Sequence, residues 1–250
     1  MIHVEDRGPD GHVRLLTIDR PKRRNALNHE TLEQLQAAVA GAVERSVDGH
    51  RTRALVLTGT GGHFCAGADL SGVEDAGFVK LLNAVLAGFR EAPFPTIAAI
   101  EGAALGAGTQ LAVACDLRTA AADATFGIPA AKLGLMVDQW TVRRLASFAG
   151  QGTARAMLLA AHTYTGAEAF GFGLVQRQGG TDAGLEWADT IVKLAPLTIA
   201  GHKVGLNETE SLPGPSDAYG EAFARAWASA DLQEGLAGFR DRRPAAFRGE

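Results

Sequence analysis

A run of glycine and alanine in the middle of the chain constrains its fold more than any other feature. The sequence ALGAGTQLAVACDL, Ala104–Leu117, follows a predicted strand at Thr96–Ile100 and continues into small apolar residues typical of a buried helix. Gly106 and Gly108 leave the backbone bare where the strand passes into the helix. Because the first N–H groups of a helix have no intrahelical partners, this junction can offer hydrogen-bond donors to a ligand.

Short apolar segments, typical of buried strands, alternate with amphipathic segments, typical of helices. The further predicted strands are Val13–Ile18, Ala54–Leu57 and Leu117–Ala120. Two segments have the apolar face of a helix, Leu32–Ala42, which Asn28 can cap, and Phe78–Phe89. A capping box of Thr165 and Glu168 predicts the start of another helix, and the sequence from about residue 184 is also helical in character. Strands that alternate with helices indicate an α/β fold with parallel strand pairing.

Composition excludes several classes of protein. The 250 residues carry a formal net charge of −4 and no long basic run, which argues against a nucleic-acid partner. No apolar run approaches the roughly 18 residues of a membrane span, and the N-terminal sequence lacks the pattern of a signal peptide. Cys65 and Cys115 fit neither a disulfide framework nor a metal site, so we expect a cytoplasmic protein without a metal.

A second turn of small residues lies in HFCAGADL, His63–Leu70, after the strand at Ala54–Leu57. Small side chains let backbone N–H groups face outward toward a carbonyl or an anion. Two such groups, converging from the two turns, would bind a thioester oxygen and stabilise it as an enolate. The alternative is that the small residues serve tight packing. GAGTQL lacks the third glycine of a dinucleotide fingerprint, and TGTGGHF lacks the lysine of a phosphate loop.

Several segments, in this order, resemble the enoyl-CoA hydratase/isomerase (crotonase) family. They are RPKRRNALN (Arg20–Asn28), HFCAGADL, the stretch Ala98–Leu135, TGAEAFGFGLV (Thr165–Val175) and the final GFRDRRP. The resemblance implies a spiral of ββα turns with an acyl-CoA site over residues 1–184 and a helical oligomerisation region over residues 185–250. It also implies an acyl-CoA thioester as ligand, with coenzyme A as part of that ligand and no separate cofactor. The expected assembly is a homo-oligomer, either a trimer or a dimer of trimers.

The resemblance also assigns the site residues. In the family, two backbone N–H groups bind the thioester oxygen, and their positions are matched here by Ala66 and Ala107. Positions that surround coenzyme A or the acyl chain are matched by Arg23, Arg24, Ala26, Gly67, Ala68, Asp69, Leu70, Gly106, Phe239 and Arg242. Phe239 and Arg242 are expected to reach the coenzyme A of a neighbouring subunit. Trp140 is placed either to form the floor of the acyl pocket or to fill the core.

The two glutamates with which hydratases of this family handle water are matched by Gln110 and Ala130. An amide does not take up a proton near neutral pH, and a methyl group forms no hydrogen bond. Each general acid or base typically contributes about 10²–10⁴-fold to a rate. Asp138 falls where some isomerases of the family keep a catalytic aspartate, but it is also well placed to cap the following helix.

Two interpretations follow. In the first, the chain is an acyl-CoA-binding protein of fatty-acid or lipid metabolism with weak or absent hydration, resembling actinobacterial members of the family that lack both glutamates. In the second, it is an active enoyl-CoA hydratase or isomerase that works through Asp138 or another acid. The missing glutamates favour the first. A peptidase with a related spiral fold is less favoured, because no serine–histidine pair accompanies the turns.

Overall fold

The computed structural model describes residues 1–47, 52–69, 76–209 and 217–246. Within these ranges the strands form two sheets. The larger has the order β1 (Ile2–Arg7), β2 (Val13–Ile18), β3 (Ala54–Gly59), β4 (Thr96–Ile100), β6 (Leu117–Ala120), β9 (Arg177–Gln178). The smaller has the order β5 (Ala103–Leu105), β7 (Thr125–Gly127), β8 (Thr163–Thr165). Pairing is antiparallel between β1 and β2 and between β7 and β8, and parallel elsewhere.

In three turns of the chain, those that lead to α2, α3 and α4, the backbone visits both sheets before it enters the helix. From β4 in the larger sheet it passes to β5 in the smaller and then to α3 (Ala107–Ala114). The next turn runs through β6, β7, a short 3₁₀ helix (Pro129–Leu133) and α4 (Gln139–Leu159). An earlier turn runs from β3 through Cys65, which bridges to Ala104 of β5, to α2 (Ala76–Glu91). This repeated order is the expected spiral of ββα turns.

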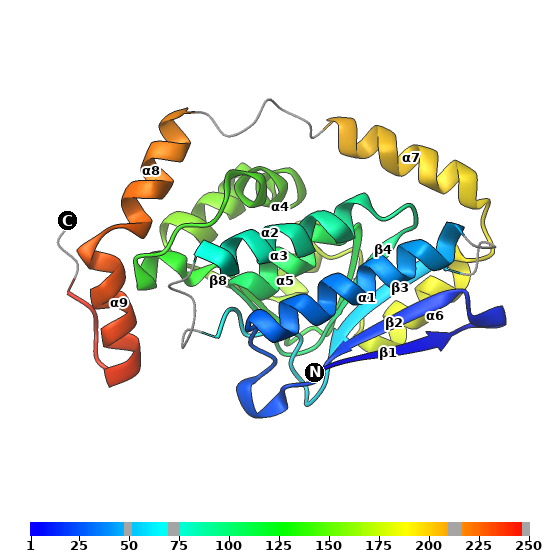
Figure 1. The fold of residues 1–250 in the computed structure, drawn as a ribbon, viewed down its shortest axis with the longest axis horizontal. Helices are drawn as coiled ribbons and strands as arrows, with labels where there is room; N and C mark the ends of the chain where they lie inside the picture. The colour runs from blue at the N-terminus through cyan, green and yellow to red at the C-terminus, as the bar shows by residue number, and fades with distance from the viewer. Residues whose placement is uncertain (48–51, 70–75, 210–216, 247–250) are drawn as a thin grey trace.

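Helices cover both faces of the larger sheet, which explains why its central strands are apolar on both sides. On one face, Leu16 of β2 and Leu57 of β3 pack with α1 (His29–Val47) and α2. On the other face, Val56 of β3 packs with Ala188 of α6 (Thr181–Ile191). The remaining helices are α5 (Gly166–Gly171), α7 (Pro196–Thr209), α8 (Asp217–Trp227) and α9 (Ala230–Asp241). Figure 1 shows α7 at one end of the molecule and α8 with α9 at the other.

The long periodic elements are where the sequence predicts them. Asn28 accepts a hydrogen bond from the Thr31 N–H at 3.0 Å and so caps α1, and the capping box of Thr165 and Glu168 begins α5. The expected boundary after residue 184 falls inside α6, a helix that packs on the sheet and belongs to its core. No helix in the described part of the chain has both the length and the apolar character that crossing a bilayer requires.

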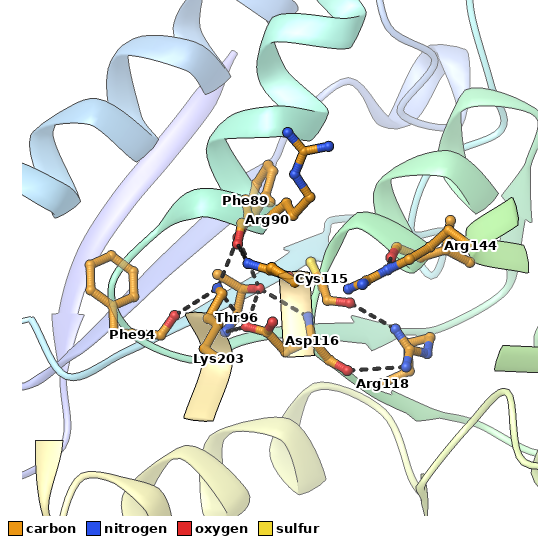
Figure 2. A network of polar contacts seen from close by, with 11 residues as sticks. Phe89, Arg90, Phe94, Thr96, Cys115, Asp116, Arg118, Arg144 and Lys203 are labelled. Carbon is orange, nitrogen blue, oxygen red and sulfur yellow. Dashed lines mark hydrogen bonds and ion pairs between the residues drawn. The ribbon is translucent and has the colours of Figure 1, made fainter. Parts of the chain in front are cut away.

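A buried ion pair fixes α7 to the rest of the molecule (Figure 2). Lys203 Nζ lies 2.7 Å from Asp116 Oδ2 and donates to the carbonyl oxygens of Phe89, at 3.1 Å, and Phe94, at 3.0 Å. Asp116 Oδ2 also accepts hydrogen bonds from the N–H and hydroxyl of Thr96, at 2.8 and 3.0 Å. Burial lowers the pKa of Lys203, and the Asp116 carboxylate opposes that shift. One ammonium group therefore joins α7 to the end of α2 and to the residues beside β4 and β6.

Replacing this ammonium should destabilise the fold. Lys203→Met leaves the Asp116 carboxylate without its cation and removes the donor to two buried carbonyl groups. We expect the free energy of unfolding to fall by about 3–5 kcal/mol, as when one partner of a buried ion pair is removed. Urea denaturation followed by circular dichroism measures it. Lys193→Met, at an exposed lysine, is the matched control and should change stability by less than about 0.5 kcal/mol. Equal losses in the two variants would contradict the anchoring role.

Candidate functional site

The two predicted turns open onto one cavity of about 480 Å³. Its walls also include residues of α2, the 3₁₀ helix at Pro129–Leu133, α8 and α9. The predicted site residues that line it are Arg23, Arg24, Ala26, Ala66, Gly67, Ala68, Asp69, Gly106, Ala107, Gln110, Ala130, Asp138 and Phe239. Leu70 lies outside the described residues. Trp140 and Arg242 are not among the described residues that line the cavity.

The first turn presents a different donor from the one predicted. The Ala66 N–H donates to the carbonyl oxygen of Arg24 at 3.0 Å, so it is already used inside the protein. Ala68 bridges to Leu27 as a parallel pair, in which the Asp69 N–H donates to Leu27 at 2.7 Å. Because successive N–H groups of an extended chain alternate in direction, the Ala68 N–H points away from Leu27. No described residue accepts a hydrogen bond from it, so Ala68 replaces Ala66 as the outward donor.

The second turn lies directly against the first. Ala107 is the first residue of α3, where a helix has N–H groups without intrahelical partners. A Cβ atom at Gly67 would lie 3.9 Å from the Ala107 nitrogen, which places the two turns side by side. A Cβ atom at Gly108 would lie 2.1 Å from the Cys65 carbonyl oxygen, so no side chain fits there. The packing alternative is therefore correct for Gly108, while the N–H of Ala107 stays available at the cavity.

Three polar side chains from α3 and α4 meet at one side of the cavity. Asp138 caps α4, since its Oδ1 accepts from the Thr141 N–H at 2.9 Å. Its Oδ2 accepts from the Thr141 hydroxyl at 2.6 Å and from Gln110 Nε2 at 3.1 Å. Gln110 Nε2 also donates to the Thr141 hydroxyl oxygen at 3.0 Å. The capping role of Asp138 is thus present, and its carboxylate reaches the cavity as well.

Apolar side chains form most of the remaining wall. They are Phe78, Leu82, Leu105, Ile128, Ala130, Leu133, Leu135, Met136, Val137, Phe223 and Trp227. The sequence analysis did not assign Phe223 and Trp227 to the site. Their rings stack on α8 with centroids 5.7 Å apart, and Trp227 Nε1 donates to the Met136 carbonyl at 3.1 Å. In the sequence, Tyr219, Phe223 and Trp227 follow one another at a spacing of four, and this helical period of aromatic residues was the available signal.

Two residues that the sequence assigned to the site, Trp140 and Arg242, do not line the cavity. Trp140 is partly buried against the core, and its ring faces the guanidinium groups of Arg90 and Arg144, whose central carbons lie 5.4 and 5.7 Å from the ring centroid. Of the two alternatives predicted for Trp140, packing against the core is the one that the structure shows. Arg242 ends α9 with a left-handed backbone and an exposed side chain. The contact predicted for it lies on a neighbouring subunit, which a single chain does not test.

The charged groups of the rim and the state of the nearby Cys65 thiol limit the chemistry that the cavity can support. The exposed Arg23 and Arg24 give its rim positive charge, whereas Asp69 is paired with Arg20 at 3.1 Å. Burial raises the pKa of the Cys65 thiol to about 12, so it is not a thiolate nucleophile at neutral pH. Among the described residues no group of three or more histidine, cysteine, aspartate or glutamate side chains is arranged to hold a metal ion. Backbone donors, a cationic rim and an apolar wall suit a ligand with an anionic end and an apolar end.

Comparison with known proteins identifies the same architecture. The sequence model of the family described as enoyl-CoA hydratase/isomerase matches residues 9–250. A Mycobacterium tuberculosis protein named probable enoyl-CoA hydratase echA6 is 42% identical over 238 residues, covering 95% of this chain and 96% of that protein. The 2,3-dehydroadipyl-CoA hydratase of Escherichia coli is 33% identical over 251 residues, covering 95% of each. The crystal structure of an enoyl-CoA hydratase/isomerase from Pseudoalteromonas atlantica is 29% identical, with a TM-score of 0.82 and 99% of each chain covered.

Proposed function

The chain belongs to the enoyl-CoA hydratase/isomerase (crotonase) family, and we propose that it binds acyl-CoA thioesters while hydrating enoyl-CoA weakly or not at all. One observation carries the proposal: two outward backbone donors adjoin a cavity that keeps neither expected glutamate. In this arrangement the thioester oxygen accepts hydrogen bonds from the N–H groups of Ala68 and Ala107. The acyl chain lies against the apolar wall, and the phosphates of coenzyme A lie near Arg23 and Arg24. Coenzyme A arrives as part of the ligand, and no separate cofactor is needed.

The polar groups of the cavity support binding better than hydration. Adding water to an enoyl thioester requires one group that takes a proton from water and one that gives a proton to carbon. The Gln110 side chain neither gives up nor takes up a proton near neutral pH, and its amide nitrogen donates hydrogen bonds to Asp138 and Thr141. Ala130 offers only a methyl group. The backbone donors do not depend on side chains, so the means of holding a thioester survives these replacements.

A second candidate is an active hydratase or isomerase that uses Asp138. Its carboxylate lines the cavity beside the position where an acyl chain would lie. Three hydrogen bonds, two from Thr141 and one from Gln110, already occupy its oxygens. Those bonds tie the carboxylate to the cap of α4 and leave less of it for contact with a ligand. We therefore rank this function second.

The cellular setting is also part of the proposal. We infer a cytoplasmic role in fatty-acid metabolism, with the chain assembled as a trimer or a dimer of trimers. The exposed apolar side chains of α7 support an assembly, since Leu197, Val204 and Leu206 are 79%, 57% and 66% exposed. Large apolar side chains gathered on one surface helix are typical of an interface between proteins.

Light scattering at micromolar concentration tests the assembly. We expect the mass of three or six chains, because the apolar side chains of α7 need a covering surface. Leu197→Asp with Val204→Asp should shift the mass toward the single chain, since a charge at each position resists burial. A wild-type protein that is monomeric throughout the micromolar range would contradict the proposed assembly.

Removing one backbone donor tests thioester binding. Ala107→Pro deletes the N–H at the first position of α3, where proline is well tolerated. We expect affinity for saturated acyl-CoAs, measured by isothermal titration calorimetry over short, medium and long chains, to fall at least about tenfold. Ala230→Pro, at the first position of α9, makes the same change at another helix start and should leave affinity unchanged. Wild-type affinity in the Ala107 variant would exclude the proposed donor.

Placing glutamates at positions 110 and 130 tests whether their absence accounts for weak hydration. On crotonyl-CoA the wild-type rate should be lower than that of a two-glutamate relative by at least about 10²-fold. Gln110→Glu with Ala130→Glu should raise it. Adding Asp138→Asn should raise it further, because a glutamate at position 110 would otherwise face the Asp138 carboxylate, and asparagine still caps the helix.

The single substitution Asp138→Asn separates the two candidate functions. An unchanged residual rate leaves Asp138 as a helix cap. A fall of about 10²-fold or more, with affinity and folding intact, makes it a proton-transfer group. Wild-type turnover near that of a two-glutamate enzyme on any enoyl-CoA would refute the proposal that the chain is a binding protein.

A further inference from the structure

The orientation of the Gln110 amide is fixed by its two polar neighbours. A carboxylate only accepts hydrogen bonds, so the atom of the Gln110 amide that faces Asp138 Oδ2 at 3.1 Å must be the nitrogen. The Thr141 hydroxyl gives its single hydrogen to Asp138 Oδ2 at 2.6 Å, so toward Gln110 it can only accept. The distance from Gln110 Nε2 to that hydroxyl oxygen is 3.0 Å. The amide nitrogen is thereby turned toward Asp138 and Thr141, and the amide oxygen is turned away from them.

The other end of the amide is an unused acceptor. Gln110 is 6% exposed, and the surface it lines is the cavity. Its Oε1 accepts no hydrogen bond from a described residue, yet it is not one of the buried polar atoms left without a partner in the described part of the chain. The carbonyl oxygen therefore lies where a ligand can reach it. Asp138 and Thr141 decide that the amide presents its acceptor, and not its donor, to the cavity. Turning the amide over would set its oxygen against the Asp138 carboxylate.

The acceptor lies beside the expected start of an acyl chain. Gln110 follows Ala107 by three residues on α3, and side chains at this spacing are neighbours about 5–6 Å apart on one helix face. A thioester oxygen held at the Ala107 N–H sets the first carbons of the acyl chain next to the Gln110 amide. Ala130, which also lines the cavity, provides no polar group to compete for the same ligand atom.

We propose, building on the acyl-CoA binding proposed above, that the cavity selects thioesters with a hydroxyl group on the first carbons beyond the thioester. The hydroxyl donates to Gln110 Oε1. A ketone at the same carbon sets one acceptor against another, and a saturated chain leaves the amide oxygen without a donor. Thr141 is a positioning residue, since it keeps the amide turned with its oxygen toward the ligand.

The test compares matched ligands on the wild-type oligomer. Isothermal titration calorimetry measures the affinity for saturated acyl-CoA, for both enantiomers of 3-hydroxyacyl-CoA and 2-hydroxyacyl-CoA, and for 3-oxoacyl-CoA, all of one chain length that the saturated series shows to bind. At least one hydroxyacyl-CoA should bind about three- to tenfold more tightly than the saturated ligand, with 3-oxoacyl-CoA the weakest. Equal affinities overturn the selectivity and leave acyl-CoA binding intact. Failure of every saturated chain length to bind overturns the proposed function itself.

Variants assign the selectivity to the amide. Thr141→Val keeps the side-chain shape and removes the hydroxyl, so one amide hydrogen becomes free and the preference for hydroxyacyl-CoA over 3-oxoacyl-CoA should fall at least threefold. Gln110→Met removes the acceptor and should abolish the preference while saturated acyl-CoA still binds. Thr190→Val, at an exposed hydroxyl of α6 that donates to Glu186, is the matched control and should keep it. The wild-type preference retained in both Thr141→Val and Gln110→Met overturns the assignment.

Discussion

The carbonyl oxygen of Cys65 lies so close to Gly108 that no side chain fits between them. This approach of one backbone to another brings the turn after β3 against the start of α3, and the two outward N–H groups then adjoin the same cavity. The sheets, their covering helices and the buried ion pair of Lys203 all serve to hold these two turns in place. A bulkier sequence at either turn would separate the two donors.

Gln110 and Asp138 are best understood together. A glutamate at position 110 would place a second carboxylate within hydrogen-bond distance of Asp138, and two like charges that close do not both stay ionised. With an amide at position 110, Nε2 donates a hydrogen bond to Asp138, which also caps α4. The loss of the general acid and the gain of a polar contact that orders the cavity therefore have the same cause, which is the chemistry of one side chain.

Local patterns were enough to predict the elements that carry strong periodicity. The strands β2, β4 and β6, the cap at Asn28 and the capping box at Thr165 depend on residues adjacent in sequence. The choice between Ala66 and Ala68 does not, because it is decided by pairing with Arg24 and Leu27, far away in the chain. The three-residue strands β5 and β7 show too little alternation to detect, and the aromatic wall from α8 depends on how a distant helix folds back over the cavity.

The cavity takes part of its wall from Phe223, Trp227 and Phe239, which stand near the C-terminal end of the sequence. A ribosome that has completed α6 has already made every strand of both sheets and both donor turns. The part of the wall that these three aromatic residues supply is still missing at that stage, and a thioester bound at the turns would leave that side of its acyl chain in water. Synthesis of the fold thus precedes synthesis of a closed site, and a nascent chain reaches its full affinity for a lipid-like ligand only when the last helices emerge.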